Sequence, residues 1–384
     1  MIYVDNAATS FPKPECVYRA IEECMRYYCA NPGRGGHYYA RLSSKIVMKA
    51  RDALSRLFNI DDPMRICITK NATEGLNIAI KGLLKPGDHV IISSMEHNAV
   101  TRPVKTLEKE IGIKVTIIKG NDRGEIDPED FRKSIAVNTK LIICTSASNV
   151  NGLIMPIEQI GEIARECEIP FLVDASQGAG YIDIDVEKMH IDMMALPGHK
   201  GLYGPQGTGA LYIKKGLNIN TLMQGGTGSN SEEVYQPGIM PDMFESGTLN
   251  TPGIAGLAAG IRFIESYGLA NIRTKKYSLV KRLTDALSDI EGVKLYNPYE
   301  MDANCGIVAF NIEGIDSAEL SSILDRDFSI AARGGLHCAP FAHKTLGTLN
   351  SGILRISPGC FNTTQDMDEI ADAVKTVCRK LHFM

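Results

Sequence analysis

Short apolar segments alternate with longer helical segments from Glu15 onward, and this alternation limits the possible folds more than any other feature of the chain. The apolar segments have the length and composition of buried strands, and the longer segments repeat apolar residues at helical spacing. Strands separated by helices form a mainly parallel sheet that helices cover on both faces, so we expect an α/β fold. Helices are predicted at Glu15–Tyr28, Ser43–Phe58, Glu74–Leu83, Pro103–Glu110 and Ile157–Cys167, and strands at Arg65–Thr69, His89–Ser93, Lys114–Ile118, Leu141–Thr145, Pro170–Val173, Met193–Leu196 and Gly209–Ile213.

The last third of the chain has a different order of elements. Glycine and proline interrupt a long irregular segment, Gln224–Pro252, which we expect to help build a functional site or a subunit interface. Two helices follow between residues 254 and 291, and residues 293–384 resemble a smaller α+β domain. A chain of 384 residues exceeds the usual size of one domain. The predicted division is 15–255 for the large domain, and 1–14 with 256–384 for the small domain.

Charge and cysteine usage exclude several classes of protein. The 41 Lys and Arg residues nearly balance 45 Asp and Glu residues, without a block of like charge, which argues against a nucleic-acid or membrane partner. No apolar run approaches the roughly 18–20 residues that span a bilayer, and the N-terminus lacks a signal-peptide pattern. The ten cysteines lack the spacing of a zinc site or a disulfide framework. We expect a cytoplasmic protein without a metal site.

Asp174 and Lys200 are the first candidate site residues. Asp174 closes an apolar strand, and the carboxyl end of such a strand is where α/β proteins bind ligands. Lys200 lies between His199 and Gly201 on a glycine-rich turn. A lysine and a carboxylate so placed suit pyridoxal phosphate, which forms a Schiff base with the lysine and whose ring nitrogen is kept protonated by the carboxylate. The alternatives are a solvated loop lysine and a helix-capping aspartate.

The other contacts that this cofactor needs are also present. Thr73 and the Ala72 amide lie where a helix follows a strand, and free N–H groups at a helix N-terminus bind phosphate. His97 follows another buried strand and can lie flat over a pyridine ring, with a second role in proton transfer. Gln177, three residues after Asp174, can reach the phenolic oxygen of the ring.

With these residues the chain resembles the class V, fold type I pyridoxal phosphate enzymes, and among them the cysteine desulfurases and selenocysteine lyases. The resemblance extends from Asp5 to Arg355. It implies a large domain with a mainly parallel seven-stranded sheet, a small α+β C-terminal domain, and pyridoxal phosphate as the cofactor.

A cysteine narrows the resemblance. The segment Ala332–Pro340 resembles the active-site loop of the second, sulfur-mobilising type of cysteine desulfurase, with Cys338 as the nucleophile. Arg333 and His337 are cationic neighbours that would favour its thiolate form. A buried core thiol is the alternative. Leu336 stands where the family often has a further histidine, which leaves the proton-transferring group near the thiol open.

The resemblance also implies roles for residues elsewhere in the chain. Arg355 would bind the substrate carboxylate, unless it forms a buried structural ion pair. Thr248 would reach the phosphate of a neighbouring subunit, which implies a homodimer with shared active sites, unless its loop stays within one chain. Arg34 and His37 would touch the substrate pocket or the partner chain, or belong to a plain loop. Further residues implied are His199 for the phosphate, Asn149 for the cofactor, and Asn6 and Arg333 for the substrate.

Two further positions depart from the family pattern. Pro197 stands where a phosphate-binding serine is usual, so one hydroxyl is missing. Gly201 is an apparent insertion directly after the lysine.

The implied activity is removal of sulfur from L-cysteine, which gives L-alanine and a persulfide on Cys338 for a sulfur-acceptor protein or a reductant. Lys200 and His97 would complete the catalytic set. Three alternatives stay open: a selenocysteine lyase with the same residues, a class V aminotransferase, epimerase or lyase that does not use Cys338, and a non-catalytic protein that binds pyridoxal phosphate.

Overall fold

The structure, a computed structural model, describes residues 1–33 and 36–382. Within these residues, the main sheet has seven strands in the order β2-β8-β7-β6-β5-β3-β4. Only β8 runs antiparallel to its neighbours, which confirms the expected mainly parallel sheet. The strands are β2 (Ile66–Thr69), β3 (His89–Ser93), β4 (Lys114–Ile118), β5 (Thr139–Thr145), β6 (Phe171–Asp174), β7 (Met193–Pro197) and β8 (Gly209–Ile213).

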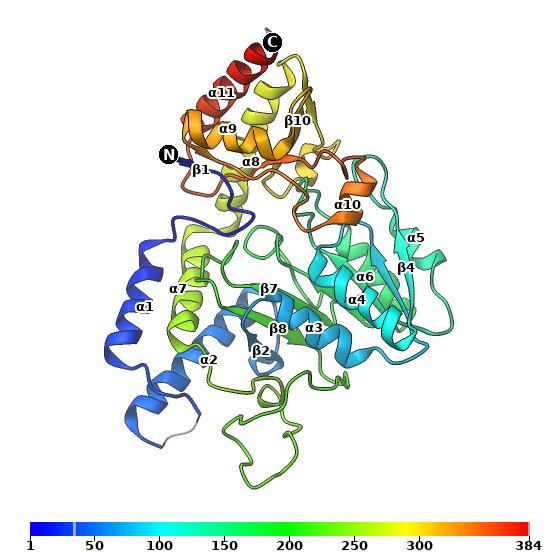
Figure 1. Ribbon diagram of the computed structural model, residues 1–384. Coiled ribbons are helices and arrows are strands. Elements are labelled where there is room, and N and C mark those ends of the chain that lie inside the picture. The colour runs from blue at the N-terminus through cyan, green and yellow to red at the C-terminus, as the bar shows by residue number, and fades with distance from the viewer. Residues whose placement is uncertain (34–35, 383–384) are drawn as a thin grey trace.

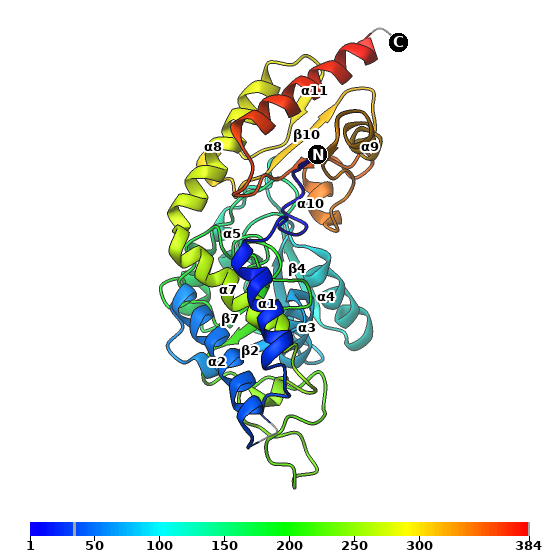
Figure 2. The same ribbon diagram turned by 90° about the vertical axis from the view of Figure 1, so that its left-hand side faces the viewer.

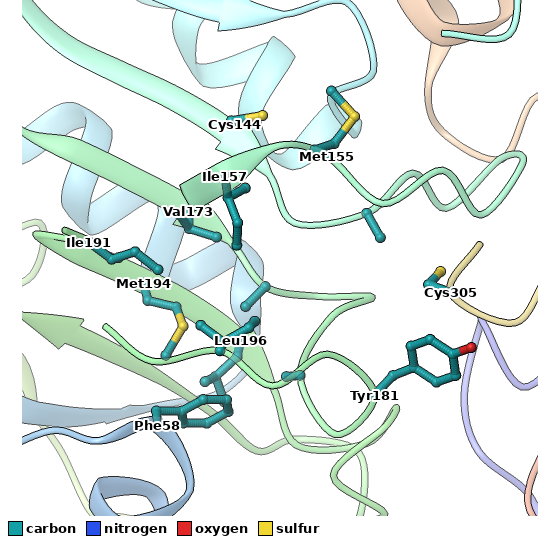
Figure 3. Packing of buried hydrophobic residues seen from close by; sticks show 14 of the residues in the cluster. Phe58, Cys144, Met155, Ile157, Val173, Tyr181, Ile191, Met194, Leu196 and Cys305 are labelled. Atoms are coloured by element: carbon teal, nitrogen blue, oxygen red, sulfur yellow. The ribbon is translucent and has the colours of Figure 1, made fainter. Parts of the chain in front are cut away.

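Helices cover both faces of this sheet (Figure 1). Alternate residues of one strand face opposite sides, and both sides are apolar here. Ile91 packs in one core cluster, whereas its neighbours Val90 and Ile92 pack in the other. Figure 3 shows Phe58 beside Met194 in the first cluster. The helices of this part are α1 (Glu15–Tyr27), α2 (Tyr38–Phe58), α3 (Ala72–Leu83), α4 (Asn98–Ile111), α5 (Pro128–Lys133), α6 (Ile157–Glu166) and α7 (Thr251–Tyr267).

The start of α4 differs from the sequence-based prediction for a physical reason. The helix begins at Asn98 rather than Pro103, because the His97 side chain accepts a hydrogen bond from the Ala99 amide and caps it. Pro103 was interpreted as the first helical residue, where proline is common, but it lies inside the helix. The short helix α5, capped by Asp127, was not predicted.

The smaller sheets lie at the other end of the molecule, beside the chain termini (Figure 2). One has three antiparallel strands in the order β12-β10-β9, and in the other β1 pairs with β11 in parallel. Val4 joins the apolar cluster of this part, so the N-terminal segment packs with these C-terminal elements. The elements are β1 (Ile2–Tyr3), α8 (Leu269–Ser288), β9 (Val293–Leu295), β10 (Val308–Ile312), α9 (Ser317–Phe328), β11 (Ile330–Ala331), α10 (Pro340–Thr345), β12 (Leu354–Ile356) and α11 (Thr364–His382).

Helices α7 and α8 connect the two parts end to end (Figure 2). Gly268 lies between them with a φ of 91°, a conformation that suits glycine. The predicted boundary between 255 and 256 falls inside α7, which packs against α1 and α2. The domain division stays a prediction. In the described part of the chain, no helix has the length and apolar character needed to cross a membrane.

A buried ion pair fixes the irregular segment before α7. Glu245 follows the short 3₁₀ helix η2 (Asp242–Phe244), and its carboxylate lies 2.5 Å from the Arg51 guanidinium of α2. Glu245 also accepts the Ile68 amide of β2 at 2.6 Å, and Arg51 donates to the Ile66 carbonyl at 3.1 Å. Both charged side chains are less than one-tenth exposed. The pair therefore joins η2, α2 and the edge strand β2.

We expect Glu245→Gln to lower the free energy of unfolding by about 3–5 kcal/mol, because it leaves the buried Arg51 charge without a counter-ion. Glu265→Gln is a matched control. Glu265 of α7 pairs at the surface with Arg56, which lies in α2 like Arg51, so this substitution should lower the free energy of unfolding by only about 0–1 kcal/mol. Urea titrations at fixed protein and cofactor concentrations measure both values. Equal losses in the two variants would contradict a structural role for the buried pair.

Candidate active site

A cavity of about 170 Å³ opens at the carboxyl ends of β5, β6 and β7, where an α/β sheet is expected to bind its ligand. It brings together every predicted cofactor residue except Thr248, which is exposed and outside the described lining. The predicted residues that line it are Ala72, Thr73, His97, Asn149, Asp174, Gln177, His199 and Lys200.

Lys200 reaches this cavity from the turn that follows β7. Burial lowers the pKa of its amine to about 8, although Asp174 partly opposes this shift. A minority of the amine, about one-tenth, is therefore unprotonated at pH 7. The glycine at position 201 is explained by a close approach of the backbone, because a Cβ atom there would collide with the carbonyl oxygen of Ala179.

The N-terminal segment holds the backbone of the lysine turn, which the sequence analysis missed. The carbonyl of His199 accepts hydrogen bonds from the Ser10 amide at 3.0 Å and from Lys13 Nζ at 2.8 Å. The Ser10 hydroxyl donates to the Lys200 carbonyl at 2.9 Å. Burial lowers the pKa of Lys13 to about 8. The only sequence signal for this contact was the position of these residues just after Asn6 in the N-terminal motif.

Two buried carboxyl groups lie at this edge of the sheet, of which Asp174 lines the cavity and Glu96 does not. Asp174 is almost fully buried, and its side chain accepts the Ser176 amide at 2.9 Å. Glu96, also missed, accepts the Ser93 hydroxyl at 2.5 Å and the Thr145 amide at 2.8 Å. Burial raises the pKa of Glu96 to about 8, so it is mostly protonated at neutral pH. Glu96 therefore ties β3 to β5 next to Asp174 without adding a full negative charge.

One end of the cavity suits an anion. The α3 N-terminus presents Ala72 and Thr73 there, while the Asn71 side chain accepts only the Glu74 amide. His199 Nδ1 is buried and has no hydrogen-bond partner among the described residues. Burial lowers the pKa of His199 to about 4, so its ring is neutral. Pro197 lines the cavity and supplies no hydroxyl, as expected.

His97 and Gln177 also line the cavity. The Nδ1 atom of His97 accepts the Ala99 amide at 3.0 Å, which places its proton on Nε2. Burial lowers the pKa of His97 and keeps the ring neutral at neutral pH. The Gln177 amide donates to the Ala7 carbonyl at 3.0 Å, so its contact with a ring oxygen stays a prediction.

Arg355 of β12 is buried next to this cavity with two hydrogen-bonded partners. Its guanidinium contacts Asp5 at 2.7 Å and donates to the Asn149 carbonyl at 2.7 Å, while its Nε has no partner in the described part of the chain. A buried structural ion pair was the alternative role expected for Arg355, with no partner named. The structure contains this pair, and the partner is Asp5. The Nε–H group is therefore a buried donor that the ion pair with Asp5 leaves unused.

Cys338 is exposed and lies on a turn attached to the mouth of the cavity. Its carbonyl accepts the Asn98 amide of α4 at 2.7 Å, and the Asn149 side chain donates to the His337 carbonyl at 2.6 Å. One sequence-based expectation was wrong. His337 is not a cationic neighbour of the thiol, because burial lowers its pKa to about 2 and its Nε2 bonds the Ile353 carbonyl.

Three of the remaining candidates, Arg333, Asn6 and His37, lie outside the lining of this cavity. Arg333 is exposed, its backbone pairs with that of Arg355, and its charge helps to lower the pKa of Lys200. Asn6 lines a second, smaller cavity with Lys200 and donates to the Ser357 carbonyl at 3.0 Å. His37 caps α2 by accepting the Ala40 amide, and Arg34 lies outside the described residues.

Comparisons with known proteins show which family this chain resembles in sequence and fold. Among solved structures, the apo cysteine desulfurase of Thermococcus onnurineus NA1 superposes with a TM-score of 0.93 at 34% identity, covering 99% of this chain and 95% of that chain. The cysteine desulfurase CsdA of Escherichia coli has a TM-score of 0.88 at 28% identity, covering 99% and 94%. A probable cysteine desulfurase of Pyrococcus abyssi is 34% identical, covering 99% of this chain and 95% of its own length. The model of the aminotransferase class-V family matches residues 2–370, and the chain therefore belongs to this family.

Proposed function

We propose that this chain is a cysteine desulfurase that uses pyridoxal phosphate to convert L-cysteine to L-alanine, with a persulfide on Cys338. One observation carries the proposal. Cys338 carries an exposed thiol, and its backbone carbonyl accepts a hydrogen bond from Asn98, the first residue of α4. Asn98 directly follows His97, which lines the cavity with Lys200, so Cys338 lies at the mouth of this cavity. Aminotransferase chemistry alone gives no reason for a thiol there. The relatives named cysteine desulfurases support the same activity.

The residues of the cavity fit the cofactor of this family. The buried, unpartnered His199 Nδ1 and the start of α3 suit a phosphate group, with Ala72 and Thr73 as further ligands. Asp174, buried at the end of β6, suits a protonated ring nitrogen. Lys200 lines the same cavity and can attach the aldehyde. Pyridoxal phosphate, when bound, supplies an electron sink that stabilises negative charge on the substrate carbons.

The chain itself must bind the substrate and move its protons. Arg355 would hold the substrate carboxylate, with Asp5 and Asn149 fixing the guanidinium plane. The Lys200 amine, with a pKa of about 8, can accept the Cα proton and return it near neutral pH. His97 would cover one face of the ring. Asn6 and Arg333 would complete the substrate pocket from the N-terminal segment and the Cys338 loop.

Cys338 would take the sulfur. Its thiolate attacks the sulfur of the substrate, so an S–S bond forms and the substrate C–S bond breaks. The electron pair of that bond stays with the carbon, which gains a proton to give L-alanine. The former substrate sulfur remains as a persulfide, which a sulfur-acceptor protein or a reductant removes. Because Cys338 is exposed, such an acceptor can reach it.

We further propose a cytoplasmic homodimer with shared active sites. The ten cysteines are all free, as is usual in a reducing compartment. Thr248 is exposed and lies away from the cavity of its own chain, as a ligand of a neighbouring phosphate would.

L-selenocysteine is a second candidate substrate, since the same residues would serve it. Comparing alanine release from the two amino acids separates these substrates.

We expect borohydride reduction of the yellow holoenzyme to attach the cofactor irreversibly to Lys200, located by peptide mass spectrometry. Lys200→Ala should contain no attached cofactor after the same treatment, because Lys200 is the only lysine among the described residues that line this cavity. Lys276→Ala is a matched control, since Lys276 is a second amine with a pKa lowered by burial and lies over the Tyr181 ring. Attachment to any other lysine, or a wild-type protein that takes up no cofactor, would refute the assigned cofactor site.

We expect Cys338→Ser to bind L-cysteine and to change its visible spectrum as the wild type does, because the Arg355 and Lys200 contacts do not involve the thiol. Alanine release should fall to background, since a serine hydroxyl without a base is a poor nucleophile. Cys29→Ser, at another exposed cysteine, is the matched control. Wild type treated with cysteine should carry a persulfide at position 338. Alanine release by Cys338→Ser at the wild-type rate would favour a lyase or aminotransferase that does not use the thiol.

Mixed dimers test the shared site. A hybrid of Thr248→Ala and Lys200→Ala subunits keeps one site with both residues intact if Thr248 acts across the interface. We therefore expect hybrids, assayed at limiting pyridoxal phosphate, to regain activity that neither variant has alone. Hybrids that stay as inactive as the parent variants would place the Thr248 contact within one chain.

A further inference from the structure

The turn that carries Cys338 has an unfavourable backbone conformation. His337 and Cys338 have φ values of 48° and 56°, so two consecutive residues with side chains lie in the left-handed region. Such residues persist only where their surroundings hold them, and they gather at functional sites. The position of the thiol therefore depends on what holds this turn.

Contacts from the large domain hold only the backbone of the turn. Asn149 donates to the His337 carbonyl at 2.6 Å, and the Asn98 amide donates to the Cys338 carbonyl at 2.7 Å. The His337 ring points the other way, into the small domain, where its Nε2 bonds the Ile353 carbonyl at 2.9 Å. The side chain that anchors the turn is therefore the imidazole of His337.

A second buried imidazole supports the first. His343 of α10 is fully buried, and its ring stacks on that of His337 with centroids 5.8 Å apart and planes 28° apart. Its Nδ1 bonds the Thr348 hydroxyl at 2.8 Å, and the Thr348 amide donates to the His343 carbonyl at 2.8 Å. The second ring is thus fixed by its own helix and by the loop after it.

Both rings are uncharged. Burial lowers the pKa of His337 to about 2 and that of His343 to about 4. Their remaining nitrogens, His337 Nδ1 and His343 Nε2, are buried without hydrogen-bond partners among the described residues. Two neutral flat rings can stack closely, whereas two imidazolium ions in that place would repel each other.

We propose that His343 is a positioning residue for the desulfurase nucleophile: its ring supports that of His337, which holds the left-handed turn that presents Cys338. The inference rests on the proposed function only for its consequence in catalysis. His343 touches neither the cavity nor the thiol, and it acts through His337. The thiol then lies at a fixed distance from the cavity mouth rather than sampling many positions.

Three variants test the stack. His343→Leu removes the flat ring, and His343→Phe keeps a ring but loses the Thr348 bond. His89→Gln is the matched control, because His89 is a buried histidine that bonds Thr139 and Thr116 at the start of β3, away from the site. The measurements are the rate of iodoacetamide alkylation at Cys338 in the substrate-free holoenzyme, by peptide mapping, and alanine release from L-cysteine. Cys16 and Cys29, both exposed, serve as internal reference thiols.

We expect His343→Leu to change the alkylation rate of Cys338 but not that of the reference thiols, and to lower alanine release by about a hundredfold, the cost of a small misplacement of a reacting group. His343→Phe should restore both measurements close to wild type, and His89→Gln should leave both unchanged. Cofactor absorbance should be the same in all four proteins. These results together would support a positioning role.

Other outcomes would overturn the inference. Unchanged Cys338 alkylation in His343→Leu would show that the turn does not need the second ring. Equal defects in the Phe and Leu variants would show that the Thr348 bond matters rather than stacking, and an equal defect in His89→Gln would show a general loss of stability. A wild type that releases no alanine from L-cysteine would refute the proposed function, while the alkylation rates would still decide the role of His343.

Discussion

The buried guanidinium of Arg355 is the charge around which the site is assembled. A lone charge in that position would cost several kcal/mol, so the fold must surround it with acceptors. Asp5 supplies the carboxylate from the N-terminal segment, and the Asn149 carbonyl supplies the second acceptor from the large domain. One side chain therefore brings together three segments that are distant in sequence. The same N-terminal segment continues to Ser10 and Lys13, which hold the carbonyl groups of the lysine turn.

Burial also decides which groups of the site carry charge. It holds the pKa of Lys200 at about 8 and raises that of Glu96 to about 8, while it keeps His199 neutral. Near neutral pH the Lys200 amine is still mostly protonated, so it and the Arg355 guanidinium place positive charge beside the cavity, whereas the rings of His97 and His199 are neutral. A cavity with such neighbours suits anionic groups such as a phosphate and a carboxylate.

The parts of the site that the sequence predicted are those set by local patterns. Asp174 and Lys200 follow apolar strands, and the ends of β3, β4 and β8 were predicted to the residue because their apolar runs have clear limits. The missed contacts join residues far apart in the chain, such as Asp5 and Arg355, which are separated by 350 positions. The expectation that His337 is positively charged was wrong for a related reason. Its burial comes from packing against His343 of α10 and from the bond to Ile353, which precedes β12, and no local pattern indicates it.

The structure divides the chemistry between a rigid part and an exposed part. The cofactor residues lie at strand ends and helix starts of the main sheet, where both faces are packed and movement is costly. Cys338 instead lies on an exposed turn whose carbonyl groups accept hydrogen bonds from the Asn98 amide and from the Asn149 side chain. A thiol that must first meet the substrate and then deliver sulfur outside needs both properties. The strained turn provides the first by holding the thiol at the cavity mouth, and its exposure provides the second.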